Sequence, residues 1–320
     1  MTKKRILTGL QPSGALHLGN YLGSLKPLVD LTFDVNNEVF LMVADYHALT
    51  SVRDGNELRA NIYEIVRDYL AAGVDPDKVT LFRQSDNSHH TEMGWVMNCL
   101  VTVPFLMQAH SYKDKVAKGL EANAGLFTYP MLMAGDIVLY DTDLVPVGED
   151  QRQHLEYTRE AVTKFNNAYG EVLKEPKEMI VEGVGIVPGT DGQKMSKSYK
   201  NTIPLFGARE EIHKAVMGIV TDSSGEKPHN VYNIHKVVYQ AIGKEVSDLD
   251  KLYEENLGKY KVLKEALFED VEMLIAPMRA KKTEISNDDV KKVLIEGVKK
   301  ARNVSGQTIE KVRDAIGINL

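Results

Sequence analysis

Two stretches that lie far apart in the sequence hold residues suited to binding a phosphate. The first, residues 8–20, contains three glycines and a proline, follows the apolar pair Ile6-Leu7 and leads into a helical pattern. Glycine lets the backbone approach a ligand closely, and the free N–H groups of a helix start favour an anion. Taken alone, this turn is equally compatible with an ordinary connection between a strand and a helix.

The second stretch, residues 189–198, is a loop rich in glycine, lysine and serine that includes Lys194, Met195, Ser196, Lys197 and Ser198. Lysine ammonium groups bind phosphate oxygens as point charges, and hydroxyl and backbone N–H groups add directional donors. A basic loop can also open for a nucleotide and then close on its phosphates. By composition alone the loop is equally well explained as solvated, so its function depends on its pairing with the first stretch.

Short apolar runs predict the sheet that would position these two stretches. Residues 38–45 are almost entirely apolar, as in a strand buried on both faces, and polar side chains follow them. A helical pattern with a candidate N-cap at Asn56 and a stop at Gly73 separates this run from a further strand at residues 79–83. This alternation predicts an α/β domain with right-handed crossovers.

Two later segments are helical in pattern. Residues 88–108 are rich in large apolar side chains, which favours core packing or, as a second interpretation, a subunit interface. Residues 129–140 predict a helix with Pro130 in its first turn and with Tyr129, Met133, Asp136 and Tyr140 on one face. A buried carboxylate at Asp136 needs a donor, but its simplest interpretation is a carboxylate facing solvent or a backbone N–H.

The remaining chain completes the sheet and then becomes helical. Residues 143–147 and 179–181 are the last expected strands, and the periodicity beyond about Pro204 is helical throughout. Residues 259–320 carry 13 Lys/Arg and 10 Asp/Glu, a mildly basic balance in a chain of net charge −6. Solvated helix faces explain this balance at least as well as a phosphate-binding surface does.

Composition and missing motifs exclude several classes of protein. A single cysteine, Cys99, excludes an intramolecular disulfide, a four-cysteine zinc site and a cysteine-held iron–sulfur cluster. Residues 183–189 look like a dinucleotide fingerprint, but Pro188 stands where its third glycine belongs, and no P-loop is present. No signal peptide and no apolar run long enough to span a bilayer is seen, so we expect a cytoplasmic protein with no membrane contact.

Together, the two stretches resemble the signatures of class I aminoacyl-tRNA synthetases. Residues 194–198 reproduce Lys-Met-Ser-Lys-Ser, and residues 17–20 stand in place of His-Ile-Gly-His, with Asn20 replacing the second imidazole. The resemblance covers nearly the whole chain. It implies a Rossmann-like parallel-sheet catalytic domain at residues 1–203, with a helical dimer-interface insertion at about 86–140. An α-helical, anticodon-binding region at residues 204–320 would follow.

Within class I the resemblance is to the tyrosyl and tryptophanyl pair, and it favours the bacterial tryptophanyl branch. Tyrosyl enzymes typically carry Tyr-x₃-Gln-x₂-Asp where this chain has Met133 in place of the Gln. A thioether makes the pocket flatter and more apolar, which suits indole better than phenol. Tyrosyl enzymes also place a Tyr and an Asp where this chain has Leu7 and Gln11. Two departures from relatives are Leu7, where many have Phe, and Tyr46, where a Gln often precedes the His.

This resemblance implies ATP-dependent activation of L-tryptophan to tryptophanyl-adenylate and its transfer to tRNA(Trp), in a homodimer, with Mg²⁺ arriving together with ATP. The implied catalytic residues are His17, Lys194 and Lys197. The implied ATP site consists of Gln11, Pro12, Ser13, His17, Gly19, Asn20, Gly148, Glu149, Asp150, Ile186, Lys194, Met195, Ser196, Lys197 and Ser198. The implied tryptophan pocket consists of Leu7, His47, Tyr129, Met133, Asp136, Val145, Val147 and Gln151, with Asp136 accepting the indole N–H.

Three alternatives stay open on the sequence. The first is specificity for tyrosine. The second is a non-catalytic relative that kept the fold as a binding module. The third is a nucleotidyltransferase that shares the first signature, although this would leave residues 194–198 and the helical C-terminal region unexplained.

Overall fold

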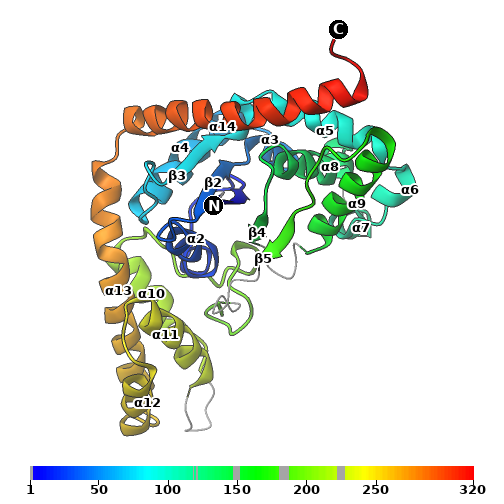
Figure 1. The fold of residues 1–320 in the computed structure, drawn as a ribbon. Helices are drawn as coiled ribbons and strands as arrows, with labels where there is room; N and C mark the ends of the chain where they lie inside the picture. Colours follow the sequence, from blue (N-terminus) through cyan, green and yellow to red (C-terminus); the bar gives the residue numbers. More distant parts are fainter. Residues whose placement is uncertain (1–2, 118, 120–121, 147–151, 180–186, 222–227) are drawn as a thin grey trace.

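A five-stranded parallel sheet forms the centre of the protein. The computed structural model describes residues 3–117, 119, 122–146, 152–179, 187–221 and 228–320 (Figure 1). The strand order is β3–β2–β1–β4–β5, and every pairing is parallel. The strands are β1 (Lys4–Leu10), β2 (Asn37–Val43), β3 (Val79–Arg83), β4 (Leu144–Pro146) and β5 (Lys177–Met179). The predicted α/β class is confirmed.

Both faces of the central strands β1 and β2 are buried, and alternate residues of these strands enter different cores. Ile6 and Val39 belong to one apolar cluster, whereas their neighbours Leu7 and Phe40 belong to a second cluster on the other face. This two-sided burial explains why β2 is a nearly continuous apolar run. The strand order reverses where β1 lies between β2 and β4, and crevices at such reversals are common ligand sites.

The first core lies under α1 (Leu18–Asn20), the π-helical segment η1 (Tyr21–Leu25), α2 (Lys26–Leu31) and α4 (Gly55–Ala71). Helix α4 corrects the expected N-cap at Asn56. Asp54 is the N-cap, and its carboxylate accepts from the backbone N–H groups of Asn56 and Glu57. A carboxylate at this position both satisfies free N–H groups and complements the helix dipole. The expected stop is present, since Gly73 adopts a left-handed φ of 106°.

The second core is covered by α5 (His89–Leu100), α6 (Val103–Leu106), α7 (His110–Ala117), α8 (Ala124–Val138) and α9 (Arg152–Tyr169). The expectation that Pro130 lies in a first turn is wrong, because α8 begins at Ala124 behind the cap Asn123 and holds Pro130 inside. Pro130 has no backbone N–H to donate inside α8, which packs against α5. The two helices approach so closely that a Cβ on Gly135 would lie 2.9 Å from the backbone nitrogen of Gly94.

The C-terminal region is helical, as predicted, and consists of α10 (Arg209–Met217), α11 (His229–Ala241), α12 (Val246–Glu255), α13 (Tyr260–Glu284) and α14 (Asn287–Ile316). Helices α10–α13 extend away from the sheet, and α14 crosses back over it (Figure 1). Gly297 lets α14 contact β3, since a Cβ there would lie 1.7 Å from the carbonyl oxygen of Leu81. Helix α14 therefore covers the edge strand β3. Among the described helices, none is long and apolar enough to cross a membrane.

Candidate active site

The first signature forms the turn after β1 and the start of α1. His17 is the N-cap of α1. Its Nδ1 accepts from the Asn20 backbone N–H (3.2 Å), and the Asn20 side-chain oxygen accepts from the His17 backbone N–H (3.1 Å). Burial and the nearby Lys197 ammonium lower the pKa of His17 to about 4, so the ring is neutral near pH 7. Asn20, which replaces the family's second histidine, thus closes the cap of this helix.

The chain that follows the second signature holds this turn in place. The backbone N–H of Leu18 donates to the carbonyl oxygen of Ile203 (2.8 Å), and that of Leu205 donates to Leu16 (3.1 Å). Residues 16–18 and 203–205 therefore lie side by side although nearly two hundred residues separate them in the sequence.

The two signatures are in direct contact. The Lys197 ammonium donates to the carbonyl oxygen of Ser13 (3.0 Å), and the backbone N–H of Gly19 lies 3.2 Å from the thioether sulfur of Met195. A larger residue at position 19 would be crowded, since a Cβ there would lie 3.1 Å from both the His17 and the Met195 side chains. The glycine of the first signature thus lets the methionine of the second pack against the helix start.

A cavity of about 310 Å³ opens between these two stretches. Six of the residues expected in the ATP site line it, namely Gln11, Ser13, His17, Asn20, Ser196 and Lys197. Leu10, Gly14, Leu16 and Ile65 complete the wall. Burial lowers the pKa of Lys197. Pro12 and Met195 are buried beside this cavity, and Lys194 and Ser198 lie on the exposed side of the same loop.

Asn201 organises the second signature, and sequence reasoning missed it. Its side-chain oxygen accepts from the Ser196 backbone N–H (2.7 Å), and its amide donates to Asp191 (2.7 Å) and to the carbonyl oxygen of Lys194 (3.0 Å). Asn201 is buried, and Gly189 leaves room for it, because a Cβ on Gly189 would lie 2.2 Å from the Asn201 amide nitrogen. A lone asparagine three residues beyond a motif carries no distinguishing signal in one sequence.

Asp136 of α8 is buried and surrounded by hydrogen-bond donors. His47 Nε2 lies 2.8 Å from its Oδ2, and His90 Nδ1 lies 2.7 Å from its Oδ1. The Gln84 amide nitrogen lies 2.9 and 3.0 Å from the two oxygens. Burial alone would raise the pKa of Asp136, but the bonds from His47 and His90 outweigh it and lower that pKa to about 2. An ionised carboxylate only accepts, so both imidazoles point a proton at it.

The donors to Asp136 are themselves oriented by neighbours at the carboxyl ends of β2 and β3. His47 lies on the short helix α3 (Asp45–Ala48), and Gln84 begins the 3₁₀ turn η2 (Gln84–Asp86). The Tyr46 backbone N–H donates to the Gln84 side-chain oxygen (3.1 Å), which turns the amide nitrogen toward Asp136. His90 Nε2 accepts from the Tyr140 hydroxyl (2.9 Å). Sequence reasoning found His47 but missed Gln84 and His90.

An apolar wall accompanies this carboxylate. Leu7 and Val145 are buried in the same cluster, and Met133 packs against it. The Tyr129 hydroxyl lies 3.0 Å from His154 Nε2, and its ring meets that of His47 edge-on at 6.1 Å. The structure therefore gathers Leu7, His47, Tyr129, Met133, Asp136 and Val145 on one side of the sheet. The expected site residues Val147, Gly148, Glu149, Asp150, Gln151 and Ile186 lie outside the described residues.

Metal-ligating side chains do not gather at this site. In the described ranges, no group of three or more His, Cys, Asp or Glu side chains has an arrangement that could hold a metal ion. The site as described thus consists of a neutral imidazole, a basic loop and a buried carboxylate beside an apolar wall.

This combination of a parallel sheet, a capped glycine turn and a basic loop in contact with it is typical of a nucleotide-binding site. Residues 2–293 match the family model described as tRNA synthetases class I (W and Y). The chain belongs to this family of class I tRNA synthetases.

Similar proteins narrow the relationship to the bacterial tryptophanyl branch of the family. The tryptophan–tRNA ligase of Fusobacterium nucleatum is 47% identical over 98% of both chains, and that of Rhodopirellula baltica is 43% identical over 98% of this chain and 99% of the relative. The crystal structure of the Campylobacter jejuni tryptophanyl-tRNA synthetase with ADP and tryptophan superposes with a TM-score of 0.89. It is 40% identical and covers 98% of this chain and 99% of its own.

Proposed function

We infer that this chain is a tryptophan–tRNA ligase that uses ATP. The main structural support is that the two signatures are in contact around one cavity. Lys197 donates to the Ser13 carbonyl oxygen, and the Gly19 backbone N–H lies against the Met195 sulfur. Full-length relatives with this activity and a similar structure with ADP and tryptophan support the same conclusion.

The tryptophan carboxylate serves as the nucleophile. It attacks the α-phosphorus of ATP, which forms tryptophanyl-adenylate and releases diphosphate. A ribose hydroxyl at the 3′ end of tRNA(Trp) then attacks the acyl carbon and releases AMP. No protein nucleophile is needed, so the protein contributes positioning and charge stabilisation.

On the ATP side, we propose that residues 11–13 and the start of α1 hold the nucleotide. His17 is neutral and accepts at Nδ1, so its Nε2–H is the donor left for a phosphate or ribose oxygen. Lys197, with Lys194 on the same loop, neutralises the transferring phosphates. Lys197 now binds the Ser13 carbonyl oxygen, so it exchanges that acceptor for a phosphate oxygen when ATP is bound. Mg²⁺ would enter with the nucleotide as part of the substrate.

On the amino-acid side, we propose that Asp136 accepts the indole N–H and that Leu7, Met133 and Val145 pack the ring. Four contacts from His47, His90 and Gln84 already occupy the lone-pair sites of Asp136. The indole N–H must therefore share Asp136 with them. The Gln84 amide nitrogen bonds both oxygens of Asp136, so it can give up one of these bonds to the indole N–H and keep the other. The resemblance supports roles for Tyr129, Val147 and Gln151 in this pocket.

We also propose a domain division and a homodimer. Residues 1–203 would form the catalytic domain with an insertion at about 86–140, and residues 204–320 the helical region that reads the anticodon. Trp95 on α5 is 70% exposed and Val103 on α6 is 56% exposed, with Met107 close behind α6. Large apolar side chains that are exposed to solvent in this insertion favour a subunit interface. A ligase of this kind would act in the cytoplasm, where tRNA is charged.

Charging of tRNA tests this proposal. The protein is incubated with ATP, labelled tryptophan and a tRNA(Trp) transcript, and labelled tRNA is counted. Accumulation of tryptophanyl-tRNA, with AMP formed in equal amount, is the expected result. Failure to charge although the protein is folded and binds ATP would favour the alternative of a non-catalytic relative.

A further inference from the structure

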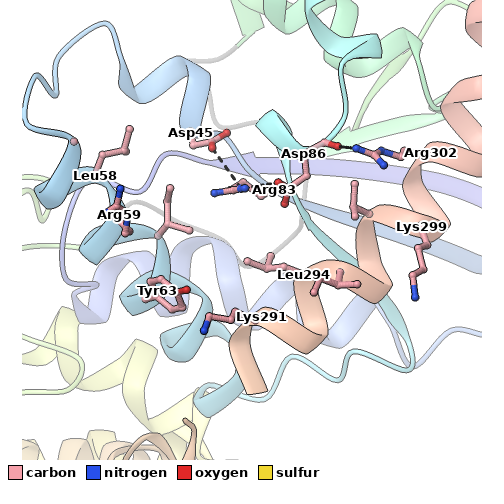
Figure 2. A pocket seen from close by; sticks show the side chains of 14 residues that line it. Asp45, Leu58, Arg59, Tyr63, Arg83, Asp86, Lys291, Leu294, Lys299 and Arg302 are labelled. Carbon is pink, nitrogen blue, oxygen red and sulfur yellow. Dashed lines mark hydrogen bonds and ion pairs between the residues drawn. The ribbon is translucent and has the colours of Figure 1, made fainter. Parts of the chain in front are cut away.

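A second cavity, of about 580 Å³, lies between α4 and α14 beside the carboxyl end of β3 (Figure 2). Its volume is in the range of small-molecule sites. It shares no lining residue with the cavity between the two signatures, and all the residues that line it are described. The reaction proposed above leaves this cavity without a role.

One wall of this cavity is apolar and aromatic. Leu58 of α4 and Leu294 of α14 lie on two sides of the cavity, and Tyr63 lies at its lower edge beside Lys291 (Figure 2). Ile62 and Val298 also line it. Apolar side chains of this kind can pack against the two faces of a planar ligand ring, and the Tyr63 ring can stack on it.

The rest of the lining is strongly cationic. Five basic residues, Arg59, Arg83, Lys291, Lys299 and Arg302, face only two acids, Asp45 and Asp86. Both acids are already engaged. Arg83 forms an ion pair with Asp86 and lies 3.8 Å from Asp45, and Asp45 also accepts from the backbone N–H and hydroxyl of Ser85. In a chain of net charge −6, this cavity is a local concentration of positive charge.

Three of these cations have little compensation from the protein. Among the described residues, Lys291 and Lys299 pair only with exposed acids of their own helix, Asp288 at 3.1 Å and Glu296 at 2.7 Å. Exposed pairs of this kind contribute little free energy. Arg59 makes no hydrogen bond or ion pair with the part of the chain that the structure describes, and the Arg83 Nε is a buried donor without a hydrogen-bond partner there. An anionic ligand would supply the missing acceptors.

We propose that this cavity binds a nucleoside phosphate. The base lies against the apolar wall and Tyr63, and the phosphate lies between Arg59 and Lys291. The carboxylate oxygen of Asp86 that Arg83 does not bind accepts from a ribose hydroxyl. A plain inorganic anion would leave the apolar wall unused, and an apolar molecule would leave the cations unpaired. The nucleoside phosphate comes either from a free nucleotide or from one nucleotide of an RNA strand.

Calorimetric titration with UMP tests the site, because UMP lacks the adenine expected in the ATP site. UMP is expected to bind at least tenfold more tightly than uridine or inorganic phosphate. Arg59→Ala and Lys291→Ala should each weaken UMP binding by about tenfold, because each removes one charge-assisted contact. Both residues are exposed, so we expect both variants to fold. Lys311→Ala removes the same charge from an exposed position of α14 outside the cavity and should leave the affinity unchanged.

Two further arms locate the site and its source. Lys197→Ala should not change the affinity for UMP. If Lys197→Ala weakens UMP binding and Arg59→Ala does not, UMP binds in the ATP site and the proposal is wrong. Equal affinity for UMP, uridine and phosphate, or indifference to both cavity variants, would also overturn it. If oligouridylate binds and Arg59→Ala weakens it as it weakens UMP, the natural source is RNA. Binding of UMP alone identifies a free nucleotide. Charging of tRNA does not enter any of these readouts.

Discussion

The ammonium of Lys197 lies 3.0 Å from the carbonyl oxygen of Ser13, 184 residues earlier in the chain. This bond joins the basic loop to the glycine turn, and it places the lysine charge at the mouth of the cavity expected to hold ATP. Since a backbone carbonyl is a weaker partner than a phosphate, the arrangement is poised to exchange one acceptor for the other.

Lys197→Ala should slow amino-acid activation far more than it weakens ATP binding. Charge stabilisation acts where charge develops, and loss of one such donor costs about 10²–10³ in rate. ATP–diphosphate exchange gives the rate, and ATP titration gives the affinity. Lys200→Asn is the matched control, since it removes one charge from the same loop and Asn tolerates the left-handed φ of 54° found there. Equal losses in rate and affinity would mean that Lys197 only binds ATP.

Asp136→Asn should weaken tryptophan binding and the discrimination against tyrosine. The amide offers one acceptor oxygen in place of two, so at least one of the donors from His47, Gln84 and His90 loses its partner. A buried donor without a partner costs ~1–3 kcal/mol, so the free energy of unfolding should also fall. The ratio of kcat/KM for tryptophan and tyrosine measures the effect on discrimination.

Gln84→Glu serves as the companion variant for Asp136. It keeps the shape of the side chain but places a second carboxyl group against Asp136, which should raise the KM for tryptophan. Unchanged kinetics in both variants would show that Asp136 is a structural carboxylate and not part of the amino-acid site.

His17 should make stability depend on pH between about 4 and 6.5. Its pKa is about 4 in the folded protein and 6.5 when unfolded, so within this window the unfolded state binds more protons. Stability therefore rises with pH through the window and is lost as pH falls, by up to about 3 kcal/mol. Measured by denaturant unfolding, the wild type should lose stability relative to His17→Asn, which keeps an N-cap side chain but does not titrate, as the pH falls from 6.5 to 4. A difference independent of pH would contradict the lowered pKa.

Asn201→Ala should loosen the basic loop and raise the KM for ATP. The Ser196 backbone N–H would lose its acceptor, and Asp191 and the Lys194 carbonyl would lose a donor. We expect a loss of ~1–3 kcal/mol in the free energy of unfolding, together with faster proteolysis at residues 191–196. Asn166→Ala provides a comparison. The Asn166 side chain bonds the backbone of Val172 and Leu173 in the segment after α9, which does not line the cavity between the two signatures. This variant should lower stability without a change in the KM for ATP.

Trp95→Glu should dissociate the proposed homodimer. A charge placed at the centre of an apolar interface opposes association. Sedimentation velocity at micromolar concentration should show a dimer for the wild type and a monomer for the variant. Val35→Glu changes a residue that is 78% exposed on another surface and should leave the dimer intact. A monomeric wild type would show that there is no homodimer. Dissociation by both variants alike would show that Trp95 does not mark the subunit contact.

Sequence patterns predicted β2 and β3, because burial on both faces of a strand produces a continuous apolar run. They missed the start of the last strand, expected at residues 179–181, because β5 begins with the exposed polar residues Lys177 and Glu178. They also predicted Gly73 as a helix stop, since few other residues adopt its φ. They failed on local caps where two candidates lay close together, as with Asp54 and Asn56. They also misplaced the start of α8, because Pro130 resembles an N-terminal proline whereas the helix begins at Ala124 behind the cap Asn123.

The partners of Asp136 could not be found in this way. Gln84 and His90 lie 52 and 46 residues from it in the sequence, and only the strand order brings them together. The return of α14 onto β3 depends likewise on the contact of Gly297 with Leu81, to which no local pattern points. Sequence identified the residues that carry a motif, whereas the structure was needed to find those that orient them.

ATP–diphosphate exchange with tryptophan and tyrosine as competing substrates decides whether this protein is a tryptophan–tRNA ligase. We expect tryptophan-dependent exchange with a kcat/KM at least about 10³-fold above that for tyrosine, because a site that pairs a buried carboxylate with an indole N–H rejects a ligand that lacks it. Exchange that depends on tyrosine, or no exchange with either amino acid, would show that the proposed function is wrong.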